Sequence, residues 1–408
     1  MLKIIAETYT IRLLGMVLSF VGTIILAREL GPDGRGVYAA LMALCAICVQ
    51  FGNLGLPGSN TYHSAKNPGF VPTLVANSIL AGIAIGALLL LALLALAHVL
   101  PQTDMLTGGL LVLGALWIPC SLIYSLLQGV VLGLMKFRSV NQVELLQRTL
   151  MLMALGVLAY VGGLTVMSAF GSSLLCLIVS GAAMLMVLRP SLGRAPRPSV
   201  RLLYRGMPYG LRIYVASIFT FLVMRIDVVV VQQRLSSEDA GLLSVAVSLA
   251  DALAVLPVVV GGIMFPQLAK EADVVNKWRI TQRSALAVAA TMGTILVVIA
   301  ASAGWFIPAL FGTPYAGAIN LFLWLTPGIF CLALTSILSP YVASVGQPLL
   351  YPIGTAIVLL SVVAFEIALV PSYGSWLAAA CISLTCFLFL CVAYVTCATY
   401  NRRQLAKC

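Results

Sequence analysis

The sequence predicts an all-α polytopic membrane protein with about 12 transmembrane helices in two six-helix bundles. The 408 residues are 62% hydrophobic and only 9% charged, with a mean hydropathy of +1.09, whereas soluble domains carry about 25% charged residues. Apolar runs of 18 or more residues, the length that a helix needs to cross a bilayer, recur along the chain. The strict alternation of barrel strands is absent, so helices must satisfy the backbone in lipid.

Turn residues or charges separate most of these apolar runs, which gives each span a start and an end. The predicted spans are residues 5–27, 37–57, 73–99, 108–132, 144–162, 165–188, 207–232, 240–268, 281–303, 315–344, 350–370 and 375–399.

Basic residues are distributed unevenly between the predicted loops. Nineteen of the 23 Lys and Arg residues lie in loops or helix ends on one side of the membrane, and three lie on the other side. Cytoplasmic loops carry such an excess, so we expect both termini in the cytoplasm. Membrane topology therefore explains the net charge of +11, and no nucleic-acid partner is predicted.

The most basic loop lies near the middle of the chain. Residues 189–205 contain five arginines and three prolines. We predict an N-terminal six-helix lobe at 1–188, a basic cytoplasmic linker at 189–206 and a C-terminal six-helix lobe at 207–408. An alternative role for the linker is contact with anionic lipid headgroups. Weak matches at an offset of half the chain length favour a parallel repeat of the two lobes.

Span seven carries Arg225 and Asp227 inside its apolar run. A charged side chain at the centre of a membrane helix costs roughly 2.5–3.5 kcal/mol on insertion scales. Residues two apart on a helix point in nearly opposite directions, so these two charges do not satisfy one another. Each is expected to face another helix or an aqueous cavity.

Several short motifs carry a family resemblance. Residues 27–38 read Ala-Arg-Glu-Leu-Gly-Pro-Asp-Gly-Arg-Gly-Val-Tyr and include Arg28, Gly31 and Gly36. Arg225-Ile226-Asp227, residues 310–318 around Gly312, and residues 344–348 follow in order. Together they resemble the Wzx-type polysaccharide biosynthesis flippases of the multidrug/oligosaccharidyl-lipid/polysaccharide (MOP) exporter superfamily, which is MATE-like.

The resemblance implies two bundles around a central cavity, alternating access and a multi-pass protein of the bacterial inner membrane. The implied substrate is an undecaprenyl-pyrophosphate-linked oligosaccharide, such as an O-antigen, capsule or exopolysaccharide repeat unit. Membrane lipid and the polymerase and chain-length proteins of the same pathway are the other expected partners, and we expect a monomer. The chain lacks the two extra spans of the lipid II flippases, which argues against a peptidoglycan precursor.

An anionic pyrophosphate that crosses the membrane needs cations along its path, and guanidinium groups match phosphate geometry. Arg12 in span one and Arg212 and Arg225 in span seven are the candidates. The alternatives are snorkelling of Arg12 and Arg212 to the cytoplasmic surface and a structural salt bridge for Arg225. Gln50 and Asn53 in span two are candidates for binding sugar hydroxyls, although they could equally join neighbouring helices.

Acidic residues within the spans are candidates for ion coupling or charge pairing. They are Asp227, Asp251 and Glu366. Asp251 either pairs with an arginine or binds a coupling H⁺ or Na⁺, and Glu366 lies near a helix end where solvation is an alternative. The two histidines lack metal-spaced partners and no nucleotide-binding motif is present. Beyond a coupling ion, we therefore expect no metal and no cofactor.

No catalytic constellation appears in the sequence, so an enzyme is not expected. The first alternative to a lipid-linked oligosaccharide flippase is a cation-coupled multidrug or metabolite antiporter of the same superfamily. The second is a membrane polysaccharide polymerase or glycosyltransferase, which would need acidic catalytic residues on a large extramembrane loop. The longest predicted loops have about 20 residues, which disfavours that alternative.

Overall fold

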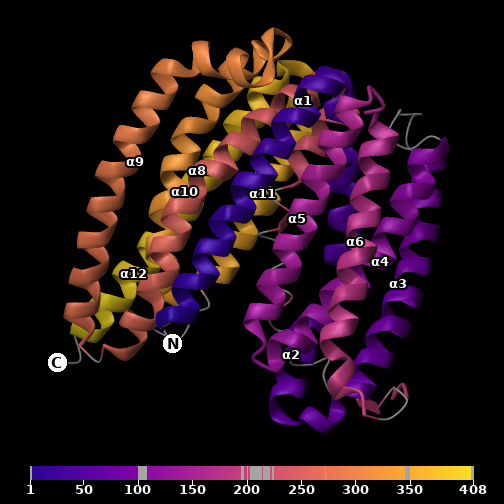
Figure 1. Ribbon diagram of the computed structural model, residues 1–408. Helices are drawn as coiled ribbons and strands as arrows, with labels where there is room; N and C mark the ends of the chain where they lie inside the picture. The colour runs from indigo at the N-terminus through magenta and orange to yellow at the C-terminus, as the bar shows by residue number, and fades with distance from the viewer. Residues whose placement is uncertain are drawn as a thin grey trace. The chain divides into compact units, whose positions relative to one another are not determined.

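The computed structural model describes residues 2–99, 108–193, 197–199, 201–202, 214, 221–222, 225–271, 273–344 and 350–405. Helices dominate these residues and no strand occurs among them, which confirms the predicted all-α class. The chain divides into two compact units, Met1–Arg225 and Ile226–Cys408 (Figure 1). Each unit is described by itself.

The first unit is a bundle of long helices with one short helix, α2, after the first long one. Its α-helices are α1 (Leu2–Asn53), α2 (Leu56–Lys66), α3 (Val71–Val99), α4 (Gly108–Gly133), α5 (Phe137–Tyr160) and α6 (Val166–Leu188). Single 3₁₀ turns precede α3 and follow α6, at Pro68–Phe70 and Arg189–Ser191.

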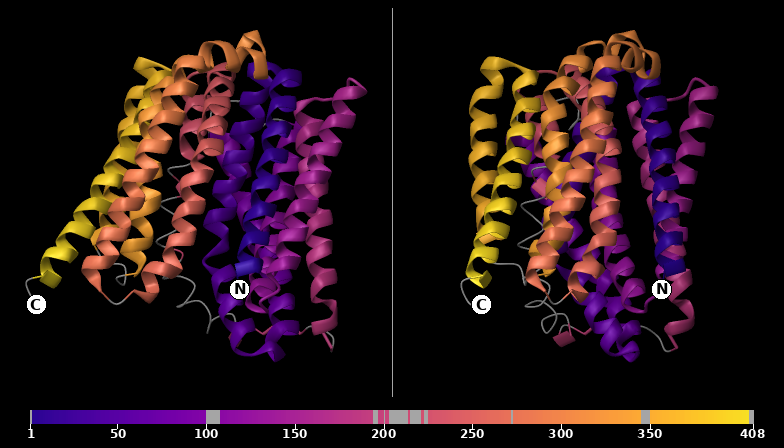
Figure 2. Two further views of the ribbon diagram at one scale, coloured as in Figure 1. Left: turned by 60° about the vertical axis from the view of Figure 1, so that its left-hand side comes forward. Right: turned by 90° about the vertical axis from the view of Figure 1, so that its left-hand side faces the viewer.

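The boundary between the units falls in a helix whose described residues include 225–234, and the second unit continues with five long helices. These are α8 (Ser237–Lys270), α9 (Val274–Phe311), α10 (Gly317–Ser344), α11 (Leu350–Tyr373) and α12 (Ser375–Leu405), with a 3₁₀ turn at Thr313–Tyr315. In both units the long helices run side by side, as the two further views show (Figure 2).

Ten helices among the described residues are long and apolar enough to cross a membrane. The first of them, Leu13–Asn53, covers most of the first two predicted spans. The break between these spans lies at Gly31, where φ is 65° and ψ is 178°. Residues other than glycine rarely adopt this backbone conformation, and the following Pro32 has no N–H to continue the helical hydrogen bonds. Gly31 therefore has a local structural role.

One predicted boundary was wrong in a way that matters for the site. Span five was predicted to begin at residue 144, but α5 begins at Phe137. The polar residues between these positions do not end the helix, because Val140 and Val143 alternate with them and are buried in the core of the first unit. Residues predicted to lie at a helix end consequently lie well inside α5.

Helix α2 packs closely on α4 through two glycines four residues apart, Gly129 and Gly133. A Cβ at Gly129 would lie 2.4 Å from the carbonyl oxygen of Pro57. Thr61 Oγ1 donates a 2.9 Å hydrogen bond to the carbonyl oxygen of Gly129, and Ser64 Oγ donates one of 3.2 Å to that of Val130. Small residues that let membrane helices approach, joined by hydroxyl hydrogen bonds, stabilise such contacts without a hydrophobic driving force.

The basic segment after α6 is anchored on α3 by two hydrogen bonds. The backbone N–H of Ser199 donates to Asn77 Oδ1 at 2.8 Å, and Asn77 Nδ2 donates to the carbonyl oxygen of Ser199 at 3.0 Å. Leu192 and Leu202 pack against the buried core of the first unit. The described part of this segment is therefore folded onto the first unit.

In the second unit, Ser383 of α12 inserts into the backbone ladder of α10. Its hydroxyl accepts from the N–H of Gly328 at 3.2 Å and donates to the carbonyl oxygen of Trp324. These two backbone groups are four residues apart and would otherwise bond to each other. The insertion lies beside Pro327, which lacks an N–H of its own.

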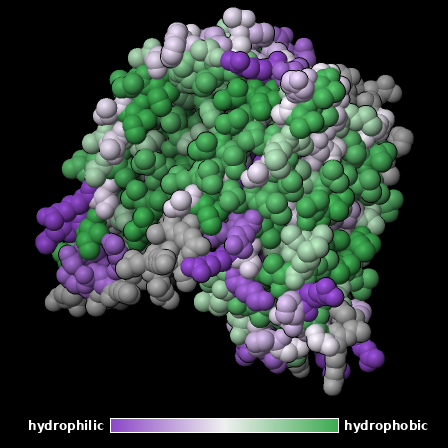
Figure 3. Space-filling model, in the orientation of Figure 1, coloured by the Kyte–Doolittle hydropathy of each residue, from purple (hydrophilic) through white to green (hydrophobic). Residues whose placement is uncertain are grey.

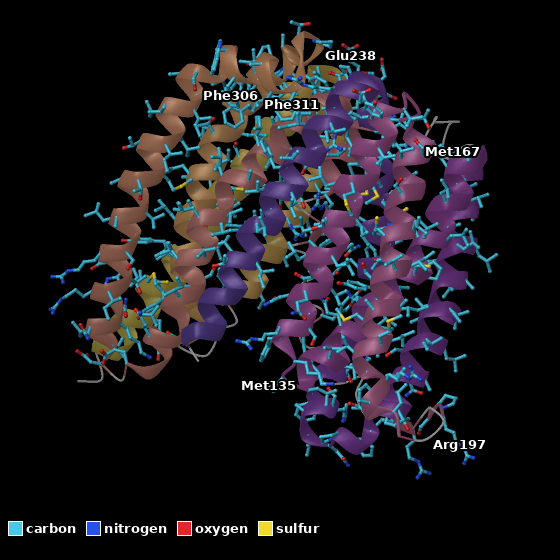
Figure 4. All side chains as sticks on the ribbon, in the orientation of Figure 1. Met135, Met167, Arg197, Glu238, Phe306 and Phe311 are labelled. Atoms are coloured by element: carbon cyan, nitrogen blue, oxygen red, sulfur yellow. The ribbon has the colours of Figure 1, made fainter. Side chains whose placement is uncertain are left out.

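Hydrophobic residues cover the lengths of the helices on the face seen in Figure 3, and hydrophilic residues gather near their ends. In the first unit, Met135 and Arg197 lie at one end and Met167 at the opposite end (Figure 4). The basic segment and the α4–α5 turn, predicted to be cytoplasmic, therefore share one end of that unit. In the second unit, Glu238 and Phe311 lie at a common end (Figure 4).

Asp239 joins the start of α8 to the start of α12, and we expect its removal to destabilise the second unit. Ser236 Oγ caps α8 by accepting from the N–H of Asp239 at 3.0 Å, and it donates to Asp239 Oδ2 at 2.7 Å. Ser375 Oγ donates to Asp239 Oδ1 at 2.7 Å. Asp239→Ala should cost about 1–3 kcal/mol, seen as a lower thermal midpoint in detergent. Glu238→Ala, next to it and exposed, is the control; equal midpoints for the two variants would contradict this role.

Candidate functional site

The predicted cavity arginines are described only in part. Arg12 lies in α1, but its side chain is outside the described residues, and so is Arg212. Arg225 lies in the helix of residues 225–234 and its side chain is exposed. Asp227, two residues later, is buried, with 7% of its surface exposed. The opposite orientations predicted for these two charges agree with this difference in exposure.

Gln50 and Asn53 hold the break between α1 and α2. Asn53 Nδ2 donates to Gln50 Oε1 at 3.0 Å, and Asn53 Oδ1 accepts from the N–H of Gly55 at 2.9 Å. Leu54 and Gly55 both have positive φ, 47° and 73°, so the backbone needs this support. Their contact with sugar hydroxyls stays a prediction, whereas their hydrogen bonds show that they stabilise the turn.

The other predicted residues lie apart from one another in the chain's elements. Asp251 lies on α8 with an exposed side chain, Arg28 is exposed near the end of the first half of α1, and Gly36 is buried in its second half. Gly312 ends α9 with a φ of 103°, a value suited to glycine. Of the family motif residues, 345–348 lie outside the described residues.

Asp227 and Glu366 come together inside the second unit. Glu366 on α11 has 1% of its surface exposed. The two carboxyl groups lie close enough to interact electrostatically. They lie within side-chain hydrogen-bonding range of each other, and no other described group bonds to either carboxyl oxygen of Glu366. Glu366 is therefore a buried acid beside a second acid, and not the solvated helix end that was its alternative.

The surroundings of this acid pair supply no described cation. Cys381 and Cys386 of α12 lie near it and are themselves buried. Two negative charges held together away from water repel strongly, and buried charges persist only when they are paired or neutralised. The pair therefore needs a cation between its oxygens, either a proton or a metal ion such as Na⁺.

A second polar cluster lies inside the first unit, around Arg148. Arg148 is the twelfth of the 24 residues of α5, about 17 Å from its start at 1.5 Å per residue. Its Nη1 donates to Ser19 Oγ on α1 at 3.3 Å. The side chain lies over Gly15, where a Cβ would be only 2.9 Å from Arg148 Cδ.

Residues of α4 complete this cluster. Gln128 Nε2 donates to Glu144 Oε1 at 2.7 Å, which ties α4 to the turn of α5 before Arg148. The buried hydroxyl of Tyr124 lies near both Glu144 and Arg148 and has no hydrogen-bond partner among the described residues. An arginine, a glutamate, an amide and a phenol therefore lie near one another on α4 and α5, with Arg148 at the middle of α5.

The sequence analysis missed this cluster because it placed the start of span five too late. With a span at 144–162, Arg148 counted as a cytoplasmic helix-end charge. A usable signal was present: Glu144 and Arg148 are four residues apart and lie on one face of a helix. The buried Val140 and Val143 continue that helix toward its N-terminus.

Comparison with known families decides what this bundle of membrane helices is. The family model described as polysaccharide biosynthesis protein matches residues 25–320. The chain belongs to this family. The match covers the motifs at residues 27–38 and 310–318. It also covers most of both polar clusters. Glu366 and the α12 cysteines near the acid pair lie outside it, as do Gly15 and Ser19 near Arg148. Among curated proteins, none has a sequence that matches this chain.

Solved structures place this family member in the MOP fold. The lipid II flippase MurJ in an inward closed conformation is 12% identical with a TM-score of 0.74, over 95% of this chain and 86% of MurJ. The eukaryotic MATE transporter AtDTX14 is 12% identical with a TM-score of 0.65, over 98% of both chains. An inward-facing multidrug resistance MATE transporter is 14% identical with a TM-score of 0.66, over 96% and 95%. The chain is a multi-pass membrane protein with the fold of these transporters.

Proposed function

We propose that the protein is a flippase that moves an undecaprenyl-pyrophosphate-linked oligosaccharide across the bacterial inner membrane. The family match over residues 25–320 carries this proposal, since it assigns the chain to polysaccharide biosynthesis. The fold shared with a lipid flippase and with MATE transporters supports transport as its task. Charged groups in the membrane interior of each unit agree with it, because such groups mark the paths of polar substrates and ions.

The acid pair gives this transporter a way to use an ion gradient. A proton or Na⁺ bound between Asp227 and Glu366 relieves the repulsion of their charges, and its release restores that repulsion. A cation therefore changes the relative stability of any two conformations in which the spacing of these helices differs. Substrate movement coupled to such a change draws its free energy from the cation gradient, without a nucleotide.

The proposal is tested in cells that lack their own flippase for a surface polysaccharide. Expression of this chain should restore the polysaccharide and lower the amount of lipid-linked oligosaccharide held in the cytoplasmic leaflet. The test is repeated in strains that make different oligosaccharide repeat units. The proposal would be contradicted if every strain still accumulated its lipid-linked oligosaccharide although normal amounts of this protein were in the membrane.

Arg225 provides a prediction specific to an anionic substrate. Its exposed guanidinium is proposed to contact the pyrophosphate, so Arg225→Ala should lower export about tenfold or more, the effect of losing a charge-assisted hydrogen bond. Export is measured as surface polysaccharide per membrane-inserted protein. Arg234→Ala, an exposed arginine at the C-terminal end of the same helix, is the control. Normal export by Arg225→Ala at normal protein level would remove Arg225 from the substrate path.

A cation-coupled antiporter for a drug or metabolite is the second candidate, favoured by the acid pair and by the similarity to MATE transporters. The two candidates differ in their expected effect on the cellular accumulation of organic cations. An antiporter should lower the cellular accumulation of organic cations such as ethidium, and a flippase should leave it unchanged.

A further inference from the structure

Arg148 carries a charge halfway along a membrane helix that no described ion pair balances. Ser19 is the one described side chain that accepts a hydrogen bond from it. A guanidinium group has five N–H donors, so most of its donors point toward no described protein acceptor. A central arginine costs roughly 2.5–3.5 kcal/mol to place in a membrane, and a single hydrogen bond of 3.3 Å to an exposed serine compensates only part of that cost.

The glycine beneath Arg148 lets the side chain lie in the space between α1 and α5. Gly15 packs against Arg148, and Gly22, seven residues later, packs against Leu155, seven residues after Arg148. A Cβ at Gly15 would lie 2.9–3.3 Å from Arg148 Cδ, Nε and Nη1, whereas one at Gly22 would lie 3.5 Å from Leu155 Cδ1. Alanine at position 15 would therefore push the end of the Arg148 side chain out of its present position, whereas alanine at position 22 would make an ordinary contact with Leu155.

The neighbours of Arg148 are arranged to leave it available. Glu144 lies on the same face of α5, one turn away, but the hydrogen bond that its carboxylate accepts comes from Gln128. The Tyr124 hydroxyl lies near both charges without a described partner of its own. Tyr124 thus lies near Arg148 with a buried hydroxyl that has no described partner, and such a hydroxyl is destabilising unless something accepts from it.

We propose that Arg148 binds a phosphate group of the lipid-linked substrate inside the first unit, with the Tyr124 hydroxyl as a second donor. This inference rests on the proposed function and names one phosphate contact of the transported molecule. A phosphate supplies the negative charge that no described ion pair gives Arg148, and it has the oxygen spacing that a guanidinium fork matches. Glu144, held by Gln128, sets the position of α5 against α4 and keeps a negative charge at the edge of the site.

Binding to the purified full chain in detergent tests the proposal. The readout is the rise in thermal midpoint with added undecaprenyl pyrophosphate, and phosphatidylglycerol is titrated in parallel. Ligand that binds only the folded state raises the midpoint according to its affinity. Arg148→Gln should weaken undecaprenyl pyrophosphate binding at least tenfold and Arg148→Lys by less, since lysine keeps the charge without the fork. Tyr124→Phe should weaken it a few-fold.

Gly15→Ala and Gly22→Ala form a matched pair on one helix face. Gly15→Ala should weaken binding several-fold because it displaces the guanidinium, and Gly22→Ala should leave binding unchanged. Equal, wild-type affinity in Arg148→Gln and Gly15→Ala would overturn the proposal. So would a lower midpoint without ligand together with an undiminished ligand-induced rise, the result expected if Arg148 only braces α1 against α5.

The two phosphate sources separate the failure of this inference from that of the proposed function. Arg148-dependent protection by phosphatidylglycerol alone would assign Arg148 to a membrane lipid headgroup and overturn the substrate contact. Protection of the wild type by neither lipid would contradict both the contact and the flippase. Protection by undecaprenyl pyrophosphate that does not depend on Arg148 would leave the flippase standing and remove only Arg148.

Discussion

Replacing Glu366 by glutamine is expected to lower polysaccharide export at least tenfold without lowering the stability of the protein. Glu366 is 1% exposed and lies within side-chain hydrogen-bonding range of Asp227, and no other described group bonds to its carboxyl oxygens. A glutamine of the same shape has no charge to repel Asp227 and brings an amide that can donate to it. The acid pair then no longer takes up and releases a cation, so the gradient loses its connection to transport. Export is measured in flippase-deficient cells, and stability as the thermal midpoint in detergent.

A loss of export without a loss of stability makes this prediction selective. If Glu366 serves only the packing of α11, export and midpoint should fall together. Glu238→Gln, at an exposed acid of the same unit, should leave both unchanged. A Glu366→Gln variant that exports at the wild-type rate would exclude the acid pair from energy coupling, whichever cation is supplied.

Gly133→Ala is expected to produce the largest loss of stability in the first unit. A Cβ at this position would lie 1.9 Å from Ser64 Oγ and 2.3 Å from the carbonyl oxygen of Thr61. The second atom is backbone and does not rotate away, so α2 must move from α4 and give up the hydrogen bond from Ser64 to Val130. Overpacking of this kind costs about 1–3 kcal/mol, occasionally more. We expect a fall of about 5 °C or more in thermal midpoint.

The control for this change is another glycine inside a membrane helix. Gly181→Ala lies in α6, where a Cβ would meet no atom within 4 Å. This variant should keep the wild-type midpoint or exceed it, because alanine favours helix over glycine by about 1 kcal/mol. Equal midpoints for Gly133→Ala and Gly181→Ala would mean that α2 is not held against α4 by close backbone approach.

The helices were largely predictable because lipid imposes one strong rule on the sequence. Long apolar runs must be helical in a bilayer, and the starts of α3, α4, α6 and α11 lie within two residues of the predicted ones. The start of α5 was not predictable in the same way. Polar Glu144 and Arg148 interrupt its apolar run, and hydropathy does not reveal that α1 and α4 supply partners for them.

The site was predictable in residue type but not in pairing. Asp227 and Glu366 stood out as intramembrane acids, yet 139 residues separate them in the chain, and only the packing of α11 brings them together. Gln50 and Asn53 stood out for their amides, and their visible role is to hold a turn at positive φ. Polarity identifies which residues need a partner, whereas tertiary structure decides which partner each one finds.

The hydroxyl of Ser383 bonds to backbone groups of Trp324 and Gly328 and so joins α12 to α10 beside Pro327. Moving α12 away from α10 would break these two hydrogen bonds in a medium that offers no water to replace them. Two helices joined in this way keep their relative orientation when they move. We therefore expect α10 and α12 to move as one rigid body during a transport cycle.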